Sequence, residues 1–175
     1  MRTRAEYVRA ETAALLDSLR GVWDETAVDE WDHALQAAAC AIADDADEEL
    51  ILAAALHDIG HSPLLGGPGV ADHSGIARDW ITARFGGRAG WLAGAHVAAK
   101  RHLAAVDPGY AASLSATSVA SLTAQGGAVV DPYFAGHPWH SDALRLRRYD
   151  DAAKDPAAPG APVQMVLDLA QRLAR

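Results

Sequence analysis

The chain has 175 residues, a net charge of −8 and one cysteine, Cys40, so we expect a single domain over residues 1–175 without a disulfide framework. The acidic balance argues against a nucleic-acid partner, which clustered lysines and arginines would bind, and no long apolar run or cleavable leader begins the chain. These features lead us to expect a soluble, cytoplasmic protein without a membrane partner, and the 40 alanines with only 6% aromatic residues favour an all-α fold.

Apolar positions at helical spacing predict seven or eight helices and no strand. In chain order they cover residues 7–22, 29–43, 48–58, 73–85, 88–104, 117–124, 141–153 and 163–173. The segment 48–58 is almost continuously apolar and should be buried on most sides. Glycine and proline predict a loop over 60–71, a stiff linker over 155–162 and a further loop over 132–140.

The strongest local signal is a histidine–aspartate pair at the end of the buried segment. His57 and Asp58 are adjacent there, and Gly60 and His61 follow. Burying an imidazole beside a carboxylate is costly unless both find partners. First-row metal ions accept both groups, and two carboxylate oxygens can bridge two ions. The pattern therefore indicates a metal site, with a buried structural His–Asp hydrogen bond as the alternative.

Three further histidines fall on predicted inward faces. His33 lies in the helix over 29–43, His73 begins the helix over 73–85, and His96 lies in the middle of the helix over 88–104. Each one alone is more typical of a hydrogen-bonded core histidine, but several unpaired imidazoles in one small core would be costly. Together they favour a shared ligand. The remaining histidines match no motif and are expected at the surface: His102, His137 and His140.

The ordered pattern H…HD…D resembles the HD superfamily, an all-α fold that holds metal between helices. Within it, several strings are similar to those of the PhnZ-like mixed-valent di-iron oxygenases, which act on organophosphonates. The strings are HALQ from position 33, ALHDIGH ending at 61, AHVAAKR ending at 101, LSATS ending at 118, QGG from 125 and LRRYDDAAK ending at 154. The resemblance covers about residues 20–155 and implies a single HD-domain helical bundle with a di-metal centre between helices; the C-terminal helix predicted from apolar spacing at about 163–173 follows it.

The resemblance also implies the ligands of two irons. They are His33, His57, Asp58 and Asp150 around one iron, and Asp58, His73 and His96 around the other. Asp150 is chosen because the family's late aspartate directly follows an aromatic residue, here Tyr149, which leaves Asp151 as a solvated or capping neighbour. The implied cofactor is a mixed-valent Fe(II)/Fe(III) pair with O₂ as co-substrate. The family places His61 near the substrate rather than on the metal.

Helical spacing places cationic and polar groups beside this centre. Lys100 lies four residues after His96 and Arg147 lies three before Asp150, so each shares a helix face with an expected ligand. A polar stripe with spacings of three and four is formed by Ser118, Ser121 and Gln125. Such groups fit a tetrahedral oxyanion, although each alone is more typical of an exposed position, or of a lysine that reaches water. In the PhnZ-like family, residues at these five positions bind the phosphonate.

One departure from the family concerns a substrate amine. Some members that cleave the C–P bond carry a tyrosine and, three residues later, a glutamate ahead of the first histidine, and Trp23 and Thr26 stand at these places. Trp23 could face a quaternary ammonium through its ring, or pack in the core. Asp24 and Glu25 could replace the missing carboxylate if the register differs by one residue.

The resemblance implies an oxygenase that oxidises a small phosphonate at the carbon bonded to phosphorus. The expected reaction cleaves the C–P bond of a 1-hydroxyalkylphosphonate, such as 2-amino-1-hydroxyethylphosphonate, to phosphate and glycine. A close alternative is a C1-hydroxylase of the 2-trimethylaminoethylphosphonate type. Alternatives from other classes are a metal-dependent HD phosphohydrolase and a catalytically silent metal-binding module. The sequence leaves the oligomeric state open.

Overall fold

The computed structural model describes residues 1–24 and 26–175, and within this part of the chain every regular element is a helix. The elements are α1 Arg4–Ser18, α2 Glu30–Ala43, α3 Glu48–Leu56, the 3₁₀ turn η1 Ile59–His61, α4 His73–Phe85, α5 Gly87–Gly94, α6 His96–Val106, α7 Pro108–Ser113, α8 Ala116–Ala124, α9 Pro132–Ala135, α10 His140–Ala152 and α11 Val163–Leu173. The all-α expectation is confirmed. None of the described helices is both long and apolar enough to cross a bilayer.

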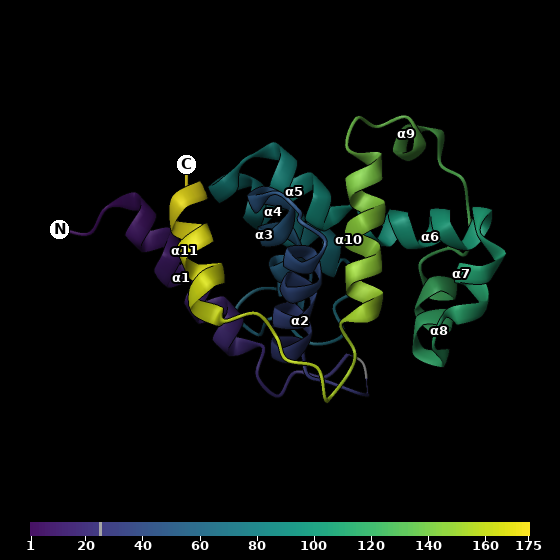
Figure 1. The fold of residues 1–175 in the computed structure, drawn as a ribbon, viewed down its shortest axis with the longest axis horizontal. Coiled ribbons are helices and arrows are strands. Elements are labelled where there is room, and N and C mark those ends of the chain that lie inside the picture. Colours follow the sequence, from purple (N-terminus) through teal and green to yellow (C-terminus); the bar gives the residue numbers. More distant parts are fainter. Residues whose placement is uncertain (25) are drawn as a thin grey trace.

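Helix α3 lies at the centre of the molecule, as its apolar sequence predicts. Most of its side chains are buried, and α2, α5, α10 and α11 pack against it. The face that α2 turns inward is rich in alanine, which lets the helices approach closely. Figure 1 shows α2 and α3 in the middle, with α10 beside them and with α1 and α11 side by side at one end.

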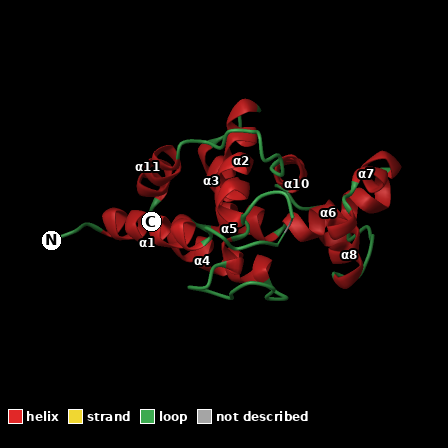
Figure 2. Cartoon of the chain, turned by 90° about the horizontal axis from the view of Figure 1, so that it is seen from below, coloured by secondary structure: helices red, strands yellow, loops and turns green. Residues whose placement is uncertain are grey.

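Helices α6, α7 and α8 form the opposite end of the molecule from α1 and α11, in both views (Figures 1 and 2). Helix α6 packs against α10 and α7. The polar stripe predicted over 117–124 lies on α8. This helix is far from α3 in the sequence, but the change of chain direction through α6 and α7 brings it back toward α10.

The helix expected over 88–104 is two helices. The backbone N–H of Ala95 bonds to the carbonyls of Trp91 and Leu92, which closes α5, and α6 begins with the next residue. His96 is thus the first residue of a helix and not in the middle of one. The break follows Gly94, a residue with low helix propensity whose missing side chain leaves room for Arg78 of α4.

Other boundaries also differ from the prediction. Helix α1 ends at Ser18 instead of 22, and α3 ends at Leu56, before η1. The short helices α7 and α9 were not expected, so the described residues contain eleven α-helices rather than seven or eight. Both begin with an aspartate cap followed by proline, at Asp107 and at Asp131. Proline at the first helical position favours a start, whereas the sequence interpretation took Pro108 as a stop and placed Pro132 in a loop.

Candidate metal centre

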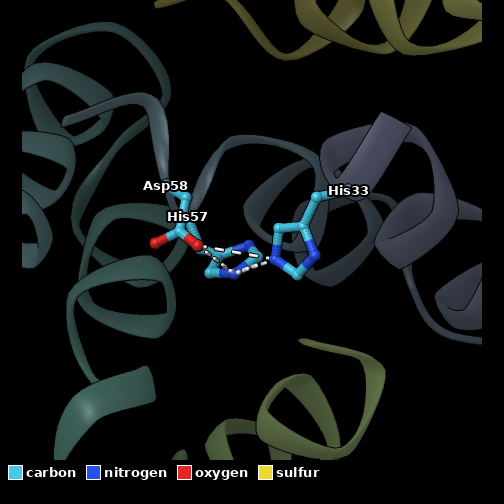
Figure 3. Close-up of side chains that lie close together, drawn as sticks. All are labelled: His33, His57 and Asp58. Atoms are coloured by element: carbon cyan, nitrogen blue, oxygen red, sulfur yellow. Dashed lines mark hydrogen bonds and ion pairs between the residues drawn. The ribbon is translucent and has the colours of Figure 1, made fainter. Parts of the chain in front are cut away.

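Six side chains predicted from the sequence converge beside the end of α3. They are His33 on α2, His57 and Asp58 just after α3, His73 at the start of α4, His96 at the start of α6 and Asp150 on α10. Figure 3 shows His33, His57 and Asp58 pointing toward one another. His57 keeps helical backbone angles, whereas Asp58 leaves them, with φ −107° and ψ 12°. The chain therefore turns between the two residues.

The second half of the cluster depends on close packing between η1 and α4. A β carbon at Gly60 would lie 2.2 Å from the carbonyl oxygen of His73, so only glycine fits there. Asp72 caps α4 by accepting a hydrogen bond from the N–H of Gly75 at 3.0 Å. These two features fix the position from which His73 extends.

The first group of donors surrounds a point between α2, α3 and α10. The Nε2 atoms of His33 and His57 lie 3.3 Å apart. Oδ2 of Asp58 lies 3.4 Å from Nε2 of His33 and 3.1 Å from Nε2 of His57. From the other side, Asp150 places Oδ1 3.6 Å from His33 and Oδ2 3.4 Å from His57. These four side chains could hold one metal ion.

The second group uses the other oxygen of the same aspartate. The Nε2 atoms of His73 and His96 lie 3.1 Å apart. Oδ1 of Asp58 lies 3.6 Å from Nε2 of His73 and 3.3 Å from Nε2 of His96. Asp58 therefore presents one carboxylate oxygen to each pair of histidines, which is the arrangement of a bridging ligand.

Backbone carbonyls fix the tautomer of three histidines. Nδ1 of His33 donates to the carbonyl of residue 153 at 2.9 Å, Nδ1 of His57 to that of residue 54 at 2.8 Å, and Nδ1 of His96 to that of residue 93 at 2.6 Å. A neutral imidazole protonated at Nδ1 keeps a lone pair on Nε2. The Nε2 atoms of His33 and His57, 3.3 Å apart, are thus both hydrogen-bond acceptors. Two such lone pairs repel each other unless a cation or a proton lies between them.

Opposing charges set the ionisation of the cluster. Burial raises the pKa of Asp58, but His57 and His33 outweigh this effect and hold that pKa well below its usual range. Burial lowers the pKa of His57, but the carboxylates of Asp58 and Asp150 outweigh it and raise that pKa well above its ordinary value. At His96 burial dominates and lowers the pKa to about 3, so this imidazole is neutral. The carboxylates of Asp58 and Asp150 therefore favour a positive charge at His57, which a proton supplies without a metal and which a bound cation would replace.

This donor set fits a pair of metal ions better than it fits a structural hydrogen bond. Oδ1 of Asp58 is buried and has no hydrogen-bond partner among the described residues. A purely structural carboxylate would have both oxygens satisfied. Instead, its free oxygen faces two Nε2 atoms, of which at least that of His96 carries a lone pair.

A cavity of about 300 Å³ opens beside the cluster, and Lys100 forms part of its wall. Lys100 is 4% exposed and donates to Oγ of Ser121 at 2.7 Å, so its ammonium does not reach bulk water as the alternative interpretation required. Burial, together with the charge of Arg147, lowers the pKa of Lys100 to about 8. Ser118 is also buried and lines the same wall, as does Gln125, whose buried Oε1 has no partner among the described residues.

Arg147 supplies the second cation of this wall and is held by carboxylates. Its Nη1 lies 2.7 Å from Oδ2 of Asp150, and its Nε donates to Oδ2 of Asp151 at 2.9 Å, with a second bond from Nη2 to Asp151. The hydroxyl of Tyr110 also donates to Asp151, at 2.8 Å. The expectation that Asp151 is solvated or a helix cap is wrong, because its i,i+4 position on α10 places it on the face of Arg147.

His61 lies between the cluster and the cavity. It is 3% exposed and stacks on the ring of His73, with ring centroids 4.4 Å apart. Its Nδ1 is buried without a hydrogen-bond partner among the described residues, and the side chain lines the cavity. It can therefore contact a small molecule bound there.

Comparison with known proteins identifies the family, although no family model matches the chain. The hydroxymethylphosphonate dioxygenase of Gimesia maris is 36% identical over 165 residues, which cover 87% of this chain and 81% of that protein. The 1-hydroxy-2-(trimethylamino)ethylphosphonate dioxygenase (glycine-betaine-forming) of Leisingera caerulea is 30% identical over 157 residues, 80% of each chain. The chain belongs to the PhnZ-like phosphonate oxygenases. An uncharacterized protein of Acanthamoeba polyphaga mimivirus is also 34% identical over 134 residues, 70% of this chain and 61% of that one.

This PhnZ-like oxygenase departs from its sequence-based expectations ahead of α2. The side chain of Trp23 is 59% exposed and is not part of the cavity lining, so the structure supports neither the substrate contact expected for it nor the alternative of core packing. Trp23 lies in the bends between α1 and α2, where no helix face directs it inward. Thr26 is exposed, Asp24 lines the cavity, and Glu25 lies outside the described residues.

Three histidines expected at the surface pack instead against aromatic rings. His102 is only 9% exposed and meets the ring of His140 at a centroid distance of 4.9 Å. His137 stacks on Trp91 at 3.7 Å. The segment over 132–140 was expected to be a loop, but it forms α9 and a turn that folds back onto α5 and α6.

Two charged cavity residues of the PhnZ-like oxygenase escaped the sequence prediction. Lys154 lies two residues past the end of α10, with Nζ 4.0 Å from Oδ1 of Asp150, four residues before it in the sequence. Glu30 is the first residue of α2 and is 3% exposed. Its sequence context, directly after the N-cap Asp29, is that of an ordinary solvated acid in a first helical turn, which gave no signal.

Proposed function

We propose that this chain is an O₂-dependent di-iron dioxygenase that cleaves the C–P bond of a 1-hydroxyalkylphosphonate. The observation that carries the proposal is one carboxylate, Asp58, shared by two histidine pairs beside a cavity whose wall is cationic. The names of two relatives agree with it, since both are dioxygenases of phosphonates with a hydroxyl on the carbon bonded to phosphorus.

The residues that would hold the irons divide into two sets around Asp58. His33, His57 and Asp150 would complete one site, and His73 and His96 the other. When bound, a half-reduced Fe(II)/Fe(III) pair supplies the redox chemistry with O₂ that no protein side chain can perform. The carbonyl bonds to Nδ1 hold three of the imidazoles in the ligating orientation before any ion arrives.

The cavity wall would bind the phosphonate. Lys100 supplies an ammonium four residues from His96, and Arg147 supplies a second positive charge held in place by Asp151. Ser118, Ser121 and Gln125 add hydroxyl and amide groups. Because the fork of Arg147 is already engaged by two carboxylates, we expect Arg147 to act through its charge and Lys100 to make the direct contact.

The proposed reaction balances without an external reductant. A 1-hydroxyalkylphosphonate dianion and O₂ give a carboxylate, hydrogen phosphate and one proton; for 2-amino-1-hydroxyethylphosphonate the carboxylate is glycine. The C–P bond and the C–H bond at the same carbon break, and the substrate supplies all four electrons that O₂ accepts. His61, beside the cavity, can accept or donate a hydrogen bond to the reacting hydroxyl.

The test is a screen of small phosphonates against the aerobic, iron-loaded protein, with O₂ uptake, phosphate and iron measured together. We expect about two irons per chain, an electron paramagnetic resonance signal from the half-reduced pair, and one O₂ consumed per phosphate released without added reductant. Oxidation of a phosphonate that lacks the hydroxyl, without phosphate release, would instead show a C1-hydroxylase. Hydrolysis of phosphate esters without O₂, by a protein that holds magnesium or zinc but no iron, would show a phosphohydrolase.

A further inference from the structure

Gln36 is a buried polar residue that the proposed function does not use. It ends the HALQ string and lies three residues after His33 on α2, so the two side chains share a helix face. Gln36 is 4% exposed and is not part of the cavity lining, so a substrate contact does not explain it. A buried amide is costly without hydrogen bonds, and its partners therefore indicate its role.

The amide of Gln36 bonds to the segment 153–162, which joins α10 to α11. Its Nε2 donates to the carbonyl of Asp155 at 2.8 Å and to that of Ala158 at 3.1 Å, and its Oε1 accepts from the N–H of Asp155 at 3.2 Å. The amide thus uses both donors and its oxygen. A reversed amide would bring its oxygen against two carbonyl oxygens, so these contacts fix its orientation.

The same segment bonds to a donor of the candidate metal centre. Nδ1 of His33 donates to the carbonyl of Ala153 at 2.9 Å. Ala153 has a ψ of 44°, whereas a helical residue has about −42°, so this carbonyl leaves the helical direction at the end of α10. Its direction depends on the path of the next residues, and Gln36 holds Asp155, two residues later.

A further contact between the segment and α2 lies too far along the chain to replace Gln36. The N–H of Ala161 donates to the carbonyl of Leu35 at 2.9 Å, and a β carbon at Gly160 would lie 2.6 Å from Cβ of Leu35. This contact draws the end of the segment onto α2. The bonds of Gln36 are closer to Ala153 in the sequence and therefore control the direction of its carbonyl more directly.

We propose that Gln36 is a positioning residue of the metal centre. By holding Asp155 and Ala158, it keeps the carbonyl of Ala153 against Nδ1 of His33, which leaves Nε2 of that ring directed at the other donors. The segment between α10 and α11 thereby becomes part of the support of one iron. This inference rests on the proposed function, because it takes His33 to be an iron ligand.

The test is a double-mutant cycle on anaerobic Fe(II) binding. Gln36→Met keeps the size of the side chain but removes its hydrogen bonds, and it is made in the unchanged chain and in His33→Ala. We expect the half-saturating Fe(II) concentration to rise about tenfold in the unchanged chain, the smaller loss typical of groups behind metal-ligating histidines. In His33→Ala the rise should stay below about twofold, because the glutamine no longer has a ligand to orient.

The control for lost stability is Val166→Ala on α11, a helix that carries none of the six donors. It removes buried apolar contacts and should leave the half-saturating Fe(II) concentration within about twofold of the unchanged chain. An equal rise in this control would overturn the inference, because Gln36 would then act through stability alone.

An equal rise from Gln36→Met in both backgrounds would overturn the inference, as would no rise in the unchanged chain. Fewer than two irons bound by the unchanged chain would instead refute the proposed function. If Gln36→Met does not fold, as judged by circular dichroism, Gln36→Glu takes its place. It keeps an acceptor for the N–H of Asp155 but sets a second oxygen against the two carbonyls, and it should give the same pattern in the cycle.

Discussion

Asp150 and Asp151 are adjacent on α10 but face different partners. Asp150 faces His33 and His57 and also pairs with Arg147, whereas Asp151 bonds to Arg147 without reaching the histidines. We therefore expect Asp150→Asn to lower iron affinity by more than the roughly 10–100-fold loss typical of groups behind the ligands. Asp151→Asn should keep the iron and raise KM for a phosphonate about tenfold, because Arg147 loses its support. Iron analysis and steady-state kinetics on both variants check this, and iron loss confined to Asp151→Asn would reverse the assignment.

Lys100 separates metal binding from substrate binding. Its ammonium contacts Ser121 and lies one helical turn from His96, without touching the donor atoms. We expect Lys100→Ala to keep the iron content and to weaken phosphonate binding by about tenfold or more, the loss typical of a buried charged contact. Elemental analysis and calorimetry measure the two effects. If this substitution emptied the centre, the division between ligands and substrate contacts would be wrong.

The same residue predicts a pH dependence. Burial and Arg147 lower the pKa of Lys100 to about 8, so the ammonium proposed to bind the phosphonate is present below this pH and is lost as the pH rises through it. We expect kcat/KM for a phosphonate to fall above about pH 8. In Lys100→Arg the guanidinium stays charged, so the alkaline fall should move to higher pH. An unchanged profile in this variant would assign the fall to another group.

At the scale of elements, the contact between η1 and α4 is the most sensitive to substitution. A β carbon at Gly60 would collide with the backbone of His73, whereas one at Gly87 would meet nothing within 4 Å. We expect Gly60→Ala to lower the free energy of unfolding by about 1–3 kcal/mol and to reduce iron content, since α4 carries His73. Gly87→Ala is the control and should be neutral or slightly stabilising. Denaturant unfolding and iron analysis compare them.

The elements show which features local sequence can predict. The helix over 73–85 and the helix over 163–173 have the bounds expected, because an apolar period agrees there with clear ends. The break at Ala95 was not predictable, since it depends on Gly94 approaching α4 and leaves the apolar period almost unchanged. Proline at the start of α7 was misinterpreted because the same residue can begin a helix or end one.

At the scale of the whole molecule, iron binding should stabilise the fold. The cluster joins α2, α3, α4, α6 and α10, and its lone pairs and carboxylates face one another. Ions that bind only the folded chain shift the unfolding equilibrium toward it. With free Fe(II) at about 100-fold above its dissociation constant, we expect the Tm to rise by roughly 5–10 °C. Anaerobic thermal scans measure this, and Asp150→Asn should show a smaller rise.

The residues of the His–Asp cluster were largely predictable, whereas the burial of Glu30 was not. His57 and Asp58 stood out because two polar residues interrupt an apolar run, and ordered spacing led to the others. Glu30 looked like any first-turn acid, and only the packing of α2 against the rest of the molecule buries it. Trp23 was open to two interpretations, a substrate contact or core packing, and its exposed side chain, which does not line the cavity, supports neither.

The shared carboxylate also determines how the centre would fill. Rotating Asp58 to suit one pair of histidines moves its second oxygen relative to the other pair, because both oxygens belong to one planar group. The first bound ion would thereby orient a ligand of the second ion, which favours binding of the second ion. The positive charge of the first ion would at the same time repel the second and weaken its binding. The binding isotherm of iron would then deviate from that of two independent sites. Positive cooperativity would show that the orientation of Asp58 has the larger effect, and negative cooperativity that charge repulsion does.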